Sequence, residues 1–399
     1  MSLRAAALDD ALAIRGADAD LLSLALIDAR NLTLRWLEVF EARGQDGNDD
    51  GGPPARWLAG HAGWYAEYWI ARHVQRGRGE HADPSALRLP SVDARADAWF
   101  QPGAAGPPDA AAVREYLAAT LDVTLELLAA AAADDDALHL YRLALLHEDR
   151  LGERLAERAA HLQLDPATEP PPPWRAQRVL GPREPLWFPP SRLMLGSAPG
   201  GCVPDNERAA HEERVPEFEI DAQVVTWERF VEFAEDGGYD RADLWSQAGW
   251  SWVQAQGRRA PRDVEQVRGG VLLQRHGRLQ RLAPGQAVQH VSRHEAEAWC
   301  RWAGRRLPTE PEWELAALTG RARGFAWGDV FEWVAGSARP WPGHATGAAS
   351  LDRLPEPGTQ GVMRGASWMT APRWRHPKAR RFAVPEADSM FVGFRSCAP

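Results

Sequence analysis

Two histidines on apolar helix faces are the residues of this chain best suited to do chemistry. His61 stands in GHAGWYAEYW and His147 stands in LALLHEDRLGERL, and the spacing of apolar residues predicts a helix for each stretch. Neutral imidazole is the commonest metal ligand in proteins, and helical bundles build metal sites from side chains on facing helices. A single histidine on such a face can also be a hydrogen-bonded core residue. The sequence alone therefore leaves a metal site and a structural role open for both.

Four amphipathic stretches in the N-terminal part would position these two histidines. A long connection rich in Pro, Gly and Asp separates the second stretch from the third. Acidic residues that can cap a helix precede the first, third and fourth stretches. The expected helices run from Asp18 to about Arg43, from about 55 to 75, from about 109 to 133 and from about 134 to 162. This pattern predicts a four-helix bundle with one long crossover.

A change in composition divides the chain into two parts. Residues 166–187 are rich in proline, which makes a semi-rigid spacer. Residues 1–165 before it are rich in Ala and Leu, whereas residues 188–399 are rich in Gly and Trp and show short strand patterns. We therefore predict a helical domain, a linker at 166–187 and a mixed α+β domain at 188–399.

Composition and charge exclude several classes of function. The formal net charge is -9, which argues against general nucleic-acid binding because that role needs a basic face. No stretch approaches the roughly 18 unbroken apolar residues of a membrane helix, and no signal peptide is visible. The three cysteines, Cys202, Cys300 and Cys397, have no metal-ligand spacing. This sparse set fits a reducing cytoplasm, where we place the protein.

Two helix-start signals flank the most distinctive segment of the C-terminal part. Ser292 with Glu295, and Thr309 with Glu312, each form the Ser/Thr-x-x-Glu pattern of a capping box. Gly304 can end the first of the two short helices. Charged residues in and after this segment, among them Arg306 and Arg395, are more typical of fold-stabilising hydrogen bonds than of catalysis.

The order of motifs in the C-terminal part resembles a known family. RLPTEPEWE, preceded by LMLGS and followed by WGDVFEWV, MRGASW and VGFRS, is similar to the formylglycine-generating-enzyme-like (sulfatase-modifying-factor) domain. The resemblance implies a C-type-lectin-like α+β fold. Family members that oxidise cysteine hold copper with a cysteine pair after the RGGSW-like motif, and no cysteine follows that motif until Cys397. Soft copper(I) prefers thiolates, so this chain is not expected to modify sulfatases.

The helical part has a resemblance of its own. GHAGWYAEYW and HEDRLGE are similar to the iron-binding helices of the DinB-like domain in ergothioneine-type sulfoxide synthases, and RLPSVDARADAWF and GFRSC resemble the selenoneine synthase branch. The resemblance implies a cytoplasmic, non-haem Fe(II) oxidoreductase. It would use O2 to join a thiol or selenol donor (cysteine, γ-glutamylcysteine or a selenosugar) to the imidazole of Nα-trimethylhistidine, a histidine betaine.

The same resemblance assigns site residues. His61 and His147 would hold Fe(II), and no catalytic residue is assigned. Histidine betaine, the chalcogen donor and O2 would be the partners, with no nucleic acid and no membrane. The residues expected to contact substrate are Trp64, Arg150, Trp333, Arg381 and Phe382.

Three departures from the family pattern keep an alternative open. The position four residues after His147, where the family has a third histidine ligand, holds Leu151, which cannot ligate a metal. The segment after RPWPGH lacks the family's tyrosine, so the proton donor is unassigned. A basic cluster (Arg373, Arg375, Lys378, Arg380 and Arg381) would be an anion or sugar site or a solvated edge. The alternative is a non-catalytic homologue that binds a small ligand or a partner.

Overall fold

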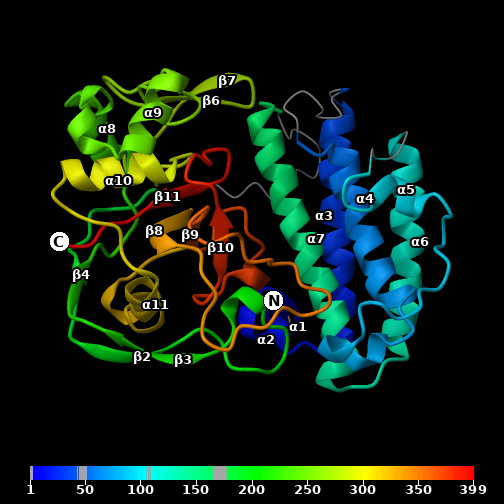
Figure 1. Cartoon of the computed structure of the whole chain (residues 1–399). Helices are drawn as coiled ribbons and strands as arrows, with labels where there is room; N and C mark the ends of the chain where they lie inside the picture. The colour runs from blue at the N-terminus through cyan, green and yellow to red at the C-terminus, as the bar shows by residue number, and fades with distance from the viewer. Residues whose placement is uncertain (1–2, 43, 45–51, 105, 107–108, 165–177) are drawn as a thin grey trace.

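The computed structural model describes residues 3–42, 44, 52–104, 106, 109–164 and 178–399, and the N-terminal part of them is helical (Figure 1). Its long helices are α3 (Ala19–Ala42), α4 (Ala55–Ala66), α6 (Ala110–Ala129) and α7 (Asp135–His161). Shorter helices are α1 (Leu3–Leu8), α2 (Ala11–Arg15) and α5 (Ala96–Phe100). The four long helices confirm the four expected from the sequence. Asp109 and Asp134 cap α6 and α7 through their side chains, as helix N-termini favour.

The second helix differs from expectation at its end. The apolar pattern predicts α-helix to about residue 75, but α4 gives way after Ala66 to a π-helical turn, Glu67–Ala71. Glu67 is buried there and accepts hydrogen bonds from Ser91 and Tyr116. Single π-helical turns occur often beside functional sites. This one lies directly after the helix that carries His61.

The C-terminal part is built around a four-stranded sheet in the order β10-β9-β8-β11. Its strands are β8 (Phe331–Ser337), β9 (Gly361–Gly365), β10 (Arg380–Ala383) and β11 (Val392–Phe394). β11 runs parallel to β8 and the other pairs are antiparallel. Around it lie α8 (Trp227–Glu235), α9 (Gln247–Gln256), α10 (Arg293–Trp302), α11 (Glu310–Thr319) and smaller strands. These are β1 (Leu186–Phe188), β2 (Ser191–Leu195), β3 (His211–Val215), β4 (Phe218–Ile220), β5 (Val264–Gln266), β6 (Leu272–Arg275) and β7 (Arg278–Arg281).

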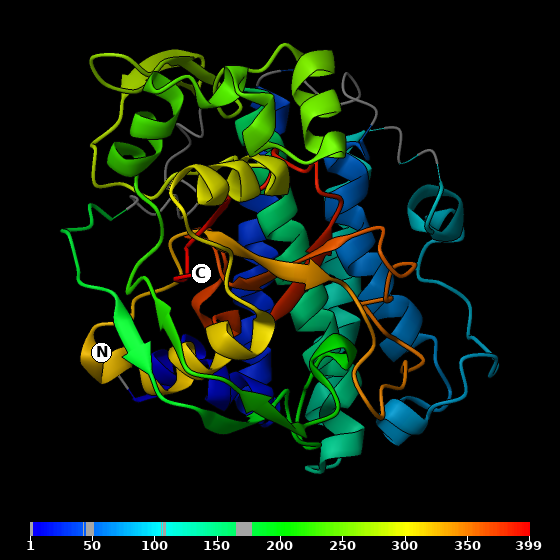
Figure 2. The same cartoon turned by 60° about the vertical axis from the view of Figure 1, so that its left-hand side comes forward.

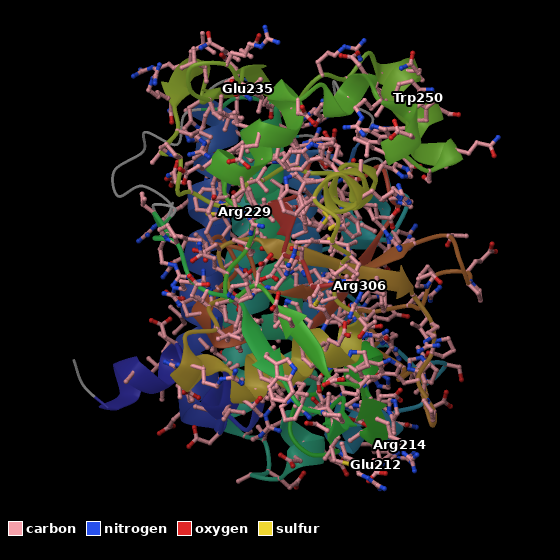
Figure 3. All side chains as sticks on the ribbon, turned by 90° about the vertical axis from the view of Figure 1, so that its left-hand side faces the viewer. Glu212, Arg214, Arg229, Glu235, Trp250 and Arg306 are labelled. Carbon is pink, nitrogen blue, oxygen red and sulfur yellow. The ribbon has the colours of Figure 1, made fainter. Side chains whose placement is uncertain are left out.

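Both predicted capping boxes are present. Ser292 caps α10 with Glu295, and Thr309 caps α11 with Glu312. The Glu312 carboxylate also binds Arg306 at 2.7 Å, and Figure 3 shows Arg306 on the side of the C-terminal part opposite the helical bundle. Arg395 is fully buried against Glu332. Arg395 is a buried charge with a paired, hydrogen-bonded partner, which fits the structural role expected for it, and the partly exposed Arg306 pairs with the capping-box glutamate of α11.

Helix α7 runs along the boundary between the two parts, and both views show it beside the central sheet (Figures 1 and 2). On one side it contacts α3 and α4; the Arg30 guanidinium of α3 binds Glu148 of α7 at 2.7 Å, both buried. On the other side Asp149 and Glu153 of α7 bind groups of the C-terminal part. Most of the predicted linker, residues 166–187, lies outside the described residues; its end contributes Leu186 to β1. Helix α7 therefore belongs to the bundle and to the interface at once.

A candidate metal site and the pocket beside it

His61 and His147 face each other across the packed helices α4 and α7. Their ring centroids lie 5.1 Å apart, and the rings meet edge to face at 77°. Both histidine side chains therefore point into the interior of the bundle, as the sequence predicts. Two imidazoles at this separation from facing helices are what a bundle metal site requires of two ligands.

The protonation state of His61 suits metal binding. Its Nδ1 lies 2.7 Å from the carbonyl oxygen of Phe100, which can only accept, so Nδ1 carries the proton and Nε2 keeps a free lone pair. Ligating histidines in proteins are commonly held by such a bond to the second nitrogen. The ring also stacks on Trp57 at 4.4 Å and on Trp64 at 5.3 Å. Burial lowers the pKa of His61 to about 4, so the ring is neutral at pH 7.

His147 offers a nitrogen with no partner in the protein. Its Nε2 is buried and accepts or donates no hydrogen bond within the described residues. Burial is also the main cause that lowers the pKa of His147 well below its usual value, and the neighbouring His61 adds to the shift. A buried polar atom without a partner is costly and calls for an explanation. A metal ion held by the two imidazoles would supply one, so both residues fit the metal that the family resemblance implies.

The third position of the site is apolar, as the sequence predicts. Leu151 is 3% exposed and packs in a cluster with Trp36, Leu58 and Leu155. Among the described residues no group of three His, Cys, Asp or Glu side chains is placed to hold a metal. The described side chains at this place therefore offer two metal ligands, His61 and His147, and not three.

A narrow pocket lies beside the neighbouring face of α7, at the contact with the C-terminal part. Its empty volume, including the open mouth, is about 460 Å³. Four arginines and three carboxylates line it, together with Phe331 and Trp374: these are Arg15, Arg150, Arg380, Arg381, Asp149, Glu153 and Glu207. We call it the interface pocket. Each of these charges is paired with another charged side chain, so the lining is polar but electrostatically balanced.

Arg150 and Arg381 are the two predicted substrate residues that reach the interface pocket. Arg150 binds Asp352 at 2.8 Å, and Arg381 binds Glu153 at 2.5 Å. Trp64 lies at the metal site instead, between His61 and Tyr68, with its indole N–H donated to Asp97 at 2.7 Å. The structure therefore distributes the predicted residues over two neighbouring sites.

Trp333 and Phe382 do not line the interface pocket. Trp333 is fully buried in the core of the C-terminal part and donates its indole N–H to the carbonyl of Val291 at 2.8 Å. Phe382 follows Arg381 on β10, and successive strand residues point to opposite faces, so Phe382 packs on a different core cluster. The expectation that Trp333 and Phe382 line a substrate pocket between the two parts is therefore not met by the interface pocket.

The basic cluster near the C-terminus is neither a solvated edge nor a set of unpaired cations. Arg373 binds Asp149 and Asp28, each at 2.7 Å, and Arg380 binds Glu310 at 2.7 Å. Arg375 donates to backbone carbonyls, and Lys378 donates to the carbonyl of Gly196. The partners come from α3, α7 and α11, which lie far away in sequence. Local sequence therefore could not show that these charges are neutralised.

Tyr65 is a site residue that sequence reasoning missed. Its ring lies 4.3 Å from that of His147, and its hydroxyl donates to the carbonyl of Ala349 at 2.6 Å. Ala349 belongs to the tyrosine-free segment after RPWPGH. Tyr65 thus ties this segment to the imidazole pair. Its position four residues after His61, on the same helix face, is the signal that could have found it.

Comparison with known proteins identifies the family to which this chain belongs. Residues 180–331 match the Sulfatase-modifying factor enzyme 1-like domain. A hercynine oxygenase of Mycobacterium tuberculosis is 30% identical and aligns with 93% of this chain and 96% of its own length. The chain belongs to the hercynine oxygenase family. A hercynine oxygenase of Mycolicibacterium thermoresistibile is 29% identical over 93% of both chains.

The family confirms the resemblance drawn from the motifs. A formylglycine-generating enzyme of Streptomyces coelicolor is 35% identical, but the match covers only 41% of this chain and 55% of that enzyme. The helical N-terminal part and the sulfatase-modifying-factor-type C-terminal part together are therefore shared with hercynine oxygenases. Within the residues that the structure describes, no helix has the length and apolar character needed to cross a bilayer.

Proposed function

We propose that this protein is a non-haem Fe(II), O2-dependent oxidoreductase. It joins a thiol or selenol donor (cysteine, γ-glutamylcysteine or a selenosugar) to the imidazole of histidine betaine, in ergothioneine- or selenoneine-type biosynthesis. The observation that carries the proposal is the pair of neutral imidazoles, His61 and His147, with the buried Nε2 of His147 left without a partner. The hercynine oxygenase relatives support the reaction class.

The domain assignment belongs to the same proposal. Residues 1–165 form a DinB-like bundle, 166–187 a linker, and 188–399 a C-type-lectin-like domain of the formylglycine-generating-enzyme type. The three cysteines are buried and free, which supports a reducing cytoplasm.

His61 and His147 would hold the iron through their Nε2 atoms. Bound iron would supply a Lewis-acid position for O2 and for the chalcogen of the donor. The protein's own residues orient the site. The carbonyl of Phe100 fixes the tautomer of His61, Tyr65 packs on His147, and burial keeps both rings neutral and therefore able to ligate.

Arg150 and Arg381 are the proposed carboxylate-binding residues. Both line the interface pocket, and a guanidinium can grip a carboxylate with two parallel hydrogen bonds. Arg150 follows His147 by three residues, so it lies on the neighbouring face of α7, one turn from the imidazole pair. Trp64, which stacks on His61, offers an aromatic surface for a quaternary ammonium group.

One observation favours a second candidate function. Leu151 stands where a third protein ligand is expected, and the described residues offer no substitute for it. The second candidate is a non-catalytic member of the family that uses the pocket to bind a small ligand or a partner.

Product formation separates the two candidates. Fe(II)-loaded protein is mixed with histidine betaine and each donor, with and without O2, and products are identified by mass spectrometry. The proposal predicts an O2-dependent C–S or C–Se product that is absent with His61→Ala. If the wild-type protein binds iron and histidine betaine but forms no product with any donor, the oxidoreductase proposal is wrong and the non-catalytic function takes its place.

A further inference from the structure

The short helix α5 contacts the surroundings of His61 in two ways, and it packs against α4, which carries that histidine (Figure 1). The carbonyl of Phe100, the last residue of α5, accepts the Nδ1 proton of His61 at 2.7 Å. Asp97, three residues earlier on α5, accepts the indole N–H of Trp64 at 2.7 Å, and Trp64 stacks on His61. One helix therefore controls both the hydrogen bond of His61 and a neighbour on one face of its ring.

A bidentate ion pair anchors α5 in this place. The Asp97 carboxylate accepts hydrogen bonds from both terminal nitrogens of the Arg72 guanidinium, at 2.7 and 3.0 Å. The third nitrogen of that guanidinium, Nε, donates to the carbonyl of Leu89 at 3.0 Å. The Arg72 side chain is 11% exposed. Exposed ion pairs contribute little to stability, but a bidentate contact to a mostly buried arginine is well placed to fix the position of a helix.

The π-helical turn after α4 places Arg72 for this contact. Its bonds join residues five apart, so the side chains that follow it point in directions that a continuous α-helix would not give. Arg72 is the residue directly after this turn, Glu67–Ala71. Glu67, the first residue of the turn, accepts hydrogen bonds from Ser91 at 2.8 Å and from the backbone N–H of Val92 at 2.6 Å. Both ends of the turn therefore bind the crossover segment that leads into α5.

A glycine beside His61 lets Phe100 approach this closely. An added Cβ at Gly60 would lie 2.0 Å from the ring of Phe100, which is too short for any side chain at that position. The Phe100 ring is fully buried and stacks on Tyr116 at 5.0 Å, so it has a fixed place against α4. Close packing thus holds the Phe100 carbonyl at His61, while the ion pair of Asp97 holds the first turn of the same helix.

We propose that Asp97 is a positioning residue for His61. With Arg72 it holds α5 so that the Phe100 carbonyl keeps the proton of His61 on Nδ1 and leaves the Nε2 lone pair free. The metal-binding consequence rests on the proposed function, because it takes His61 as a ligand, whereas the effect on the proton concerns the metal-free protein. Without the ion pair, α5 would move away from the ring, and neutral His61 would populate both tautomers, only one of which presents Nε2 to a metal.

Nitrogen-15 NMR of the metal-free, full-length protein with labelled histidine tests the proposal directly, and His61→Gln identifies the signals of His61. We expect wild type at pH 7.5 to show Nδ1 protonated and Nε2 unprotonated, and Asp97→Ala to show a mixture of the two tautomers. Arg72→Gln removes the other half of the ion pair and should give the same mixture. Asp93→Ala is the matched control: Asp93 lies in the same crossover and binds the exposed Arg95 at 2.8 Å, so His61 should keep the wild-type tautomer.

Iron affinity gives a second readout. Loss of a partner that holds a ligating histidine typically weakens metal binding by roughly 10- to 100-fold, so Asp97→Ala should weaken Fe(II) binding about tenfold, and Asp93→Ala should not change it. A wild-type tautomer and wild-type affinity in Asp97→Ala, even with a lower unfolding free energy, would show a purely structural role and overturn the proposal. Equal effects in Asp93→Ala would overturn it as well. If wild type binds no iron, the proposed function fails, and the tautomers still decide this inference.

Discussion

The chemistry of single residues at the imidazole pair is set by burial. His61 is 8% exposed, and its only acceptor is the carbonyl of Phe100. Protonation would place a charge in a nearly dry site without a carboxylate to balance it. A neutral imidazole with a fixed tautomer, such as His61, suits metal binding, and its burial also makes the metal-free fold sensitive to acid.

Acid should destabilise the metal-free protein partly through His61. The pKa of His61 falls from 6.5 to about 4 on folding, so between these values the unfolded chain binds the extra proton. Stability is therefore complete above pH 6.5 and is lost as the pH falls toward 4. At pH 5 the loss from His61 is about 2 kcal/mol by this linkage.

Urea unfolding at pH 7.5 and pH 5.0 measures the effect. In His61→Gln the difference in unfolding free energy between the two pH values should shrink by about 2 kcal/mol. An equal pH dependence in the variant and the wild type would contradict a neutral, buried His61.

At the scale of elements, α7 connects the metal site with the C-terminal part. One face presents His147, and the neighbouring face presents Asp149 and Glu153 to segment 367–381. Asp149 accepts hydrogen bonds from Arg373 and from the indole of Trp374, both buried. This contact fixes where α7, and with it His147, lies against the central sheet.

Asp149→Asn should be strongly destabilising. The change leaves the buried Arg373 guanidinium without its main counter-charge, a situation that typically costs about 3–5 kcal/mol. Arg192→Gln breaks the exposed Arg192–Glu212 pair and should cost less than about 1 kcal/mol. Chemical denaturation compares both variants with wild type, and similar small losses would show that the α7 contact contributes little.

The elements that could be predicted from the sequence are those whose patterns involve residues close together in the chain. Capping boxes at Ser292 and Thr309, and the apolar period around His61 and His147, involve neighbours within one or two turns, so their helices could be predicted. The π-helical turn after Ala66, the burial of Trp333 and the pairing of Arg373 depend on distant segments. Tertiary contacts decide those features, and a single sequence does not display them.

At the scale of the whole molecule, the two parts share their interior. Tyr65 reaches Ala349, Arg15 binds Glu207 at 2.8 Å, and Ser367 donates to Glu153 at 2.5 Å. These contacts are buried and join residues far apart in sequence. The interface pocket is lined by residues of both parts and exists only while the parts stay together.

Heat should unfold the chain in one cooperative transition. Because buried ion pairs cross the interface, either part would leave unpaired charges behind if it unfolded alone. Differential scanning calorimetry of the metal-free protein should give equal calorimetric and van't Hoff enthalpies. Two resolved transitions would mean that the parts fold independently and that α7 is not a shared element.

The central claim is that His61 and His147 together bind a divalent metal despite Leu151. Its most direct test is an anaerobic Fe(II) titration of the purified protein, with and without histidine betaine. His147→Ala is compared with His139→Ala, which removes a buried histidine from the same helix but outside the pair. We predict one iron per chain in wild type and His139→Ala, tighter binding with the betaine, and none in His147→Ala. Equal binding in His147→Ala, or no binding in wild type, would contradict the account.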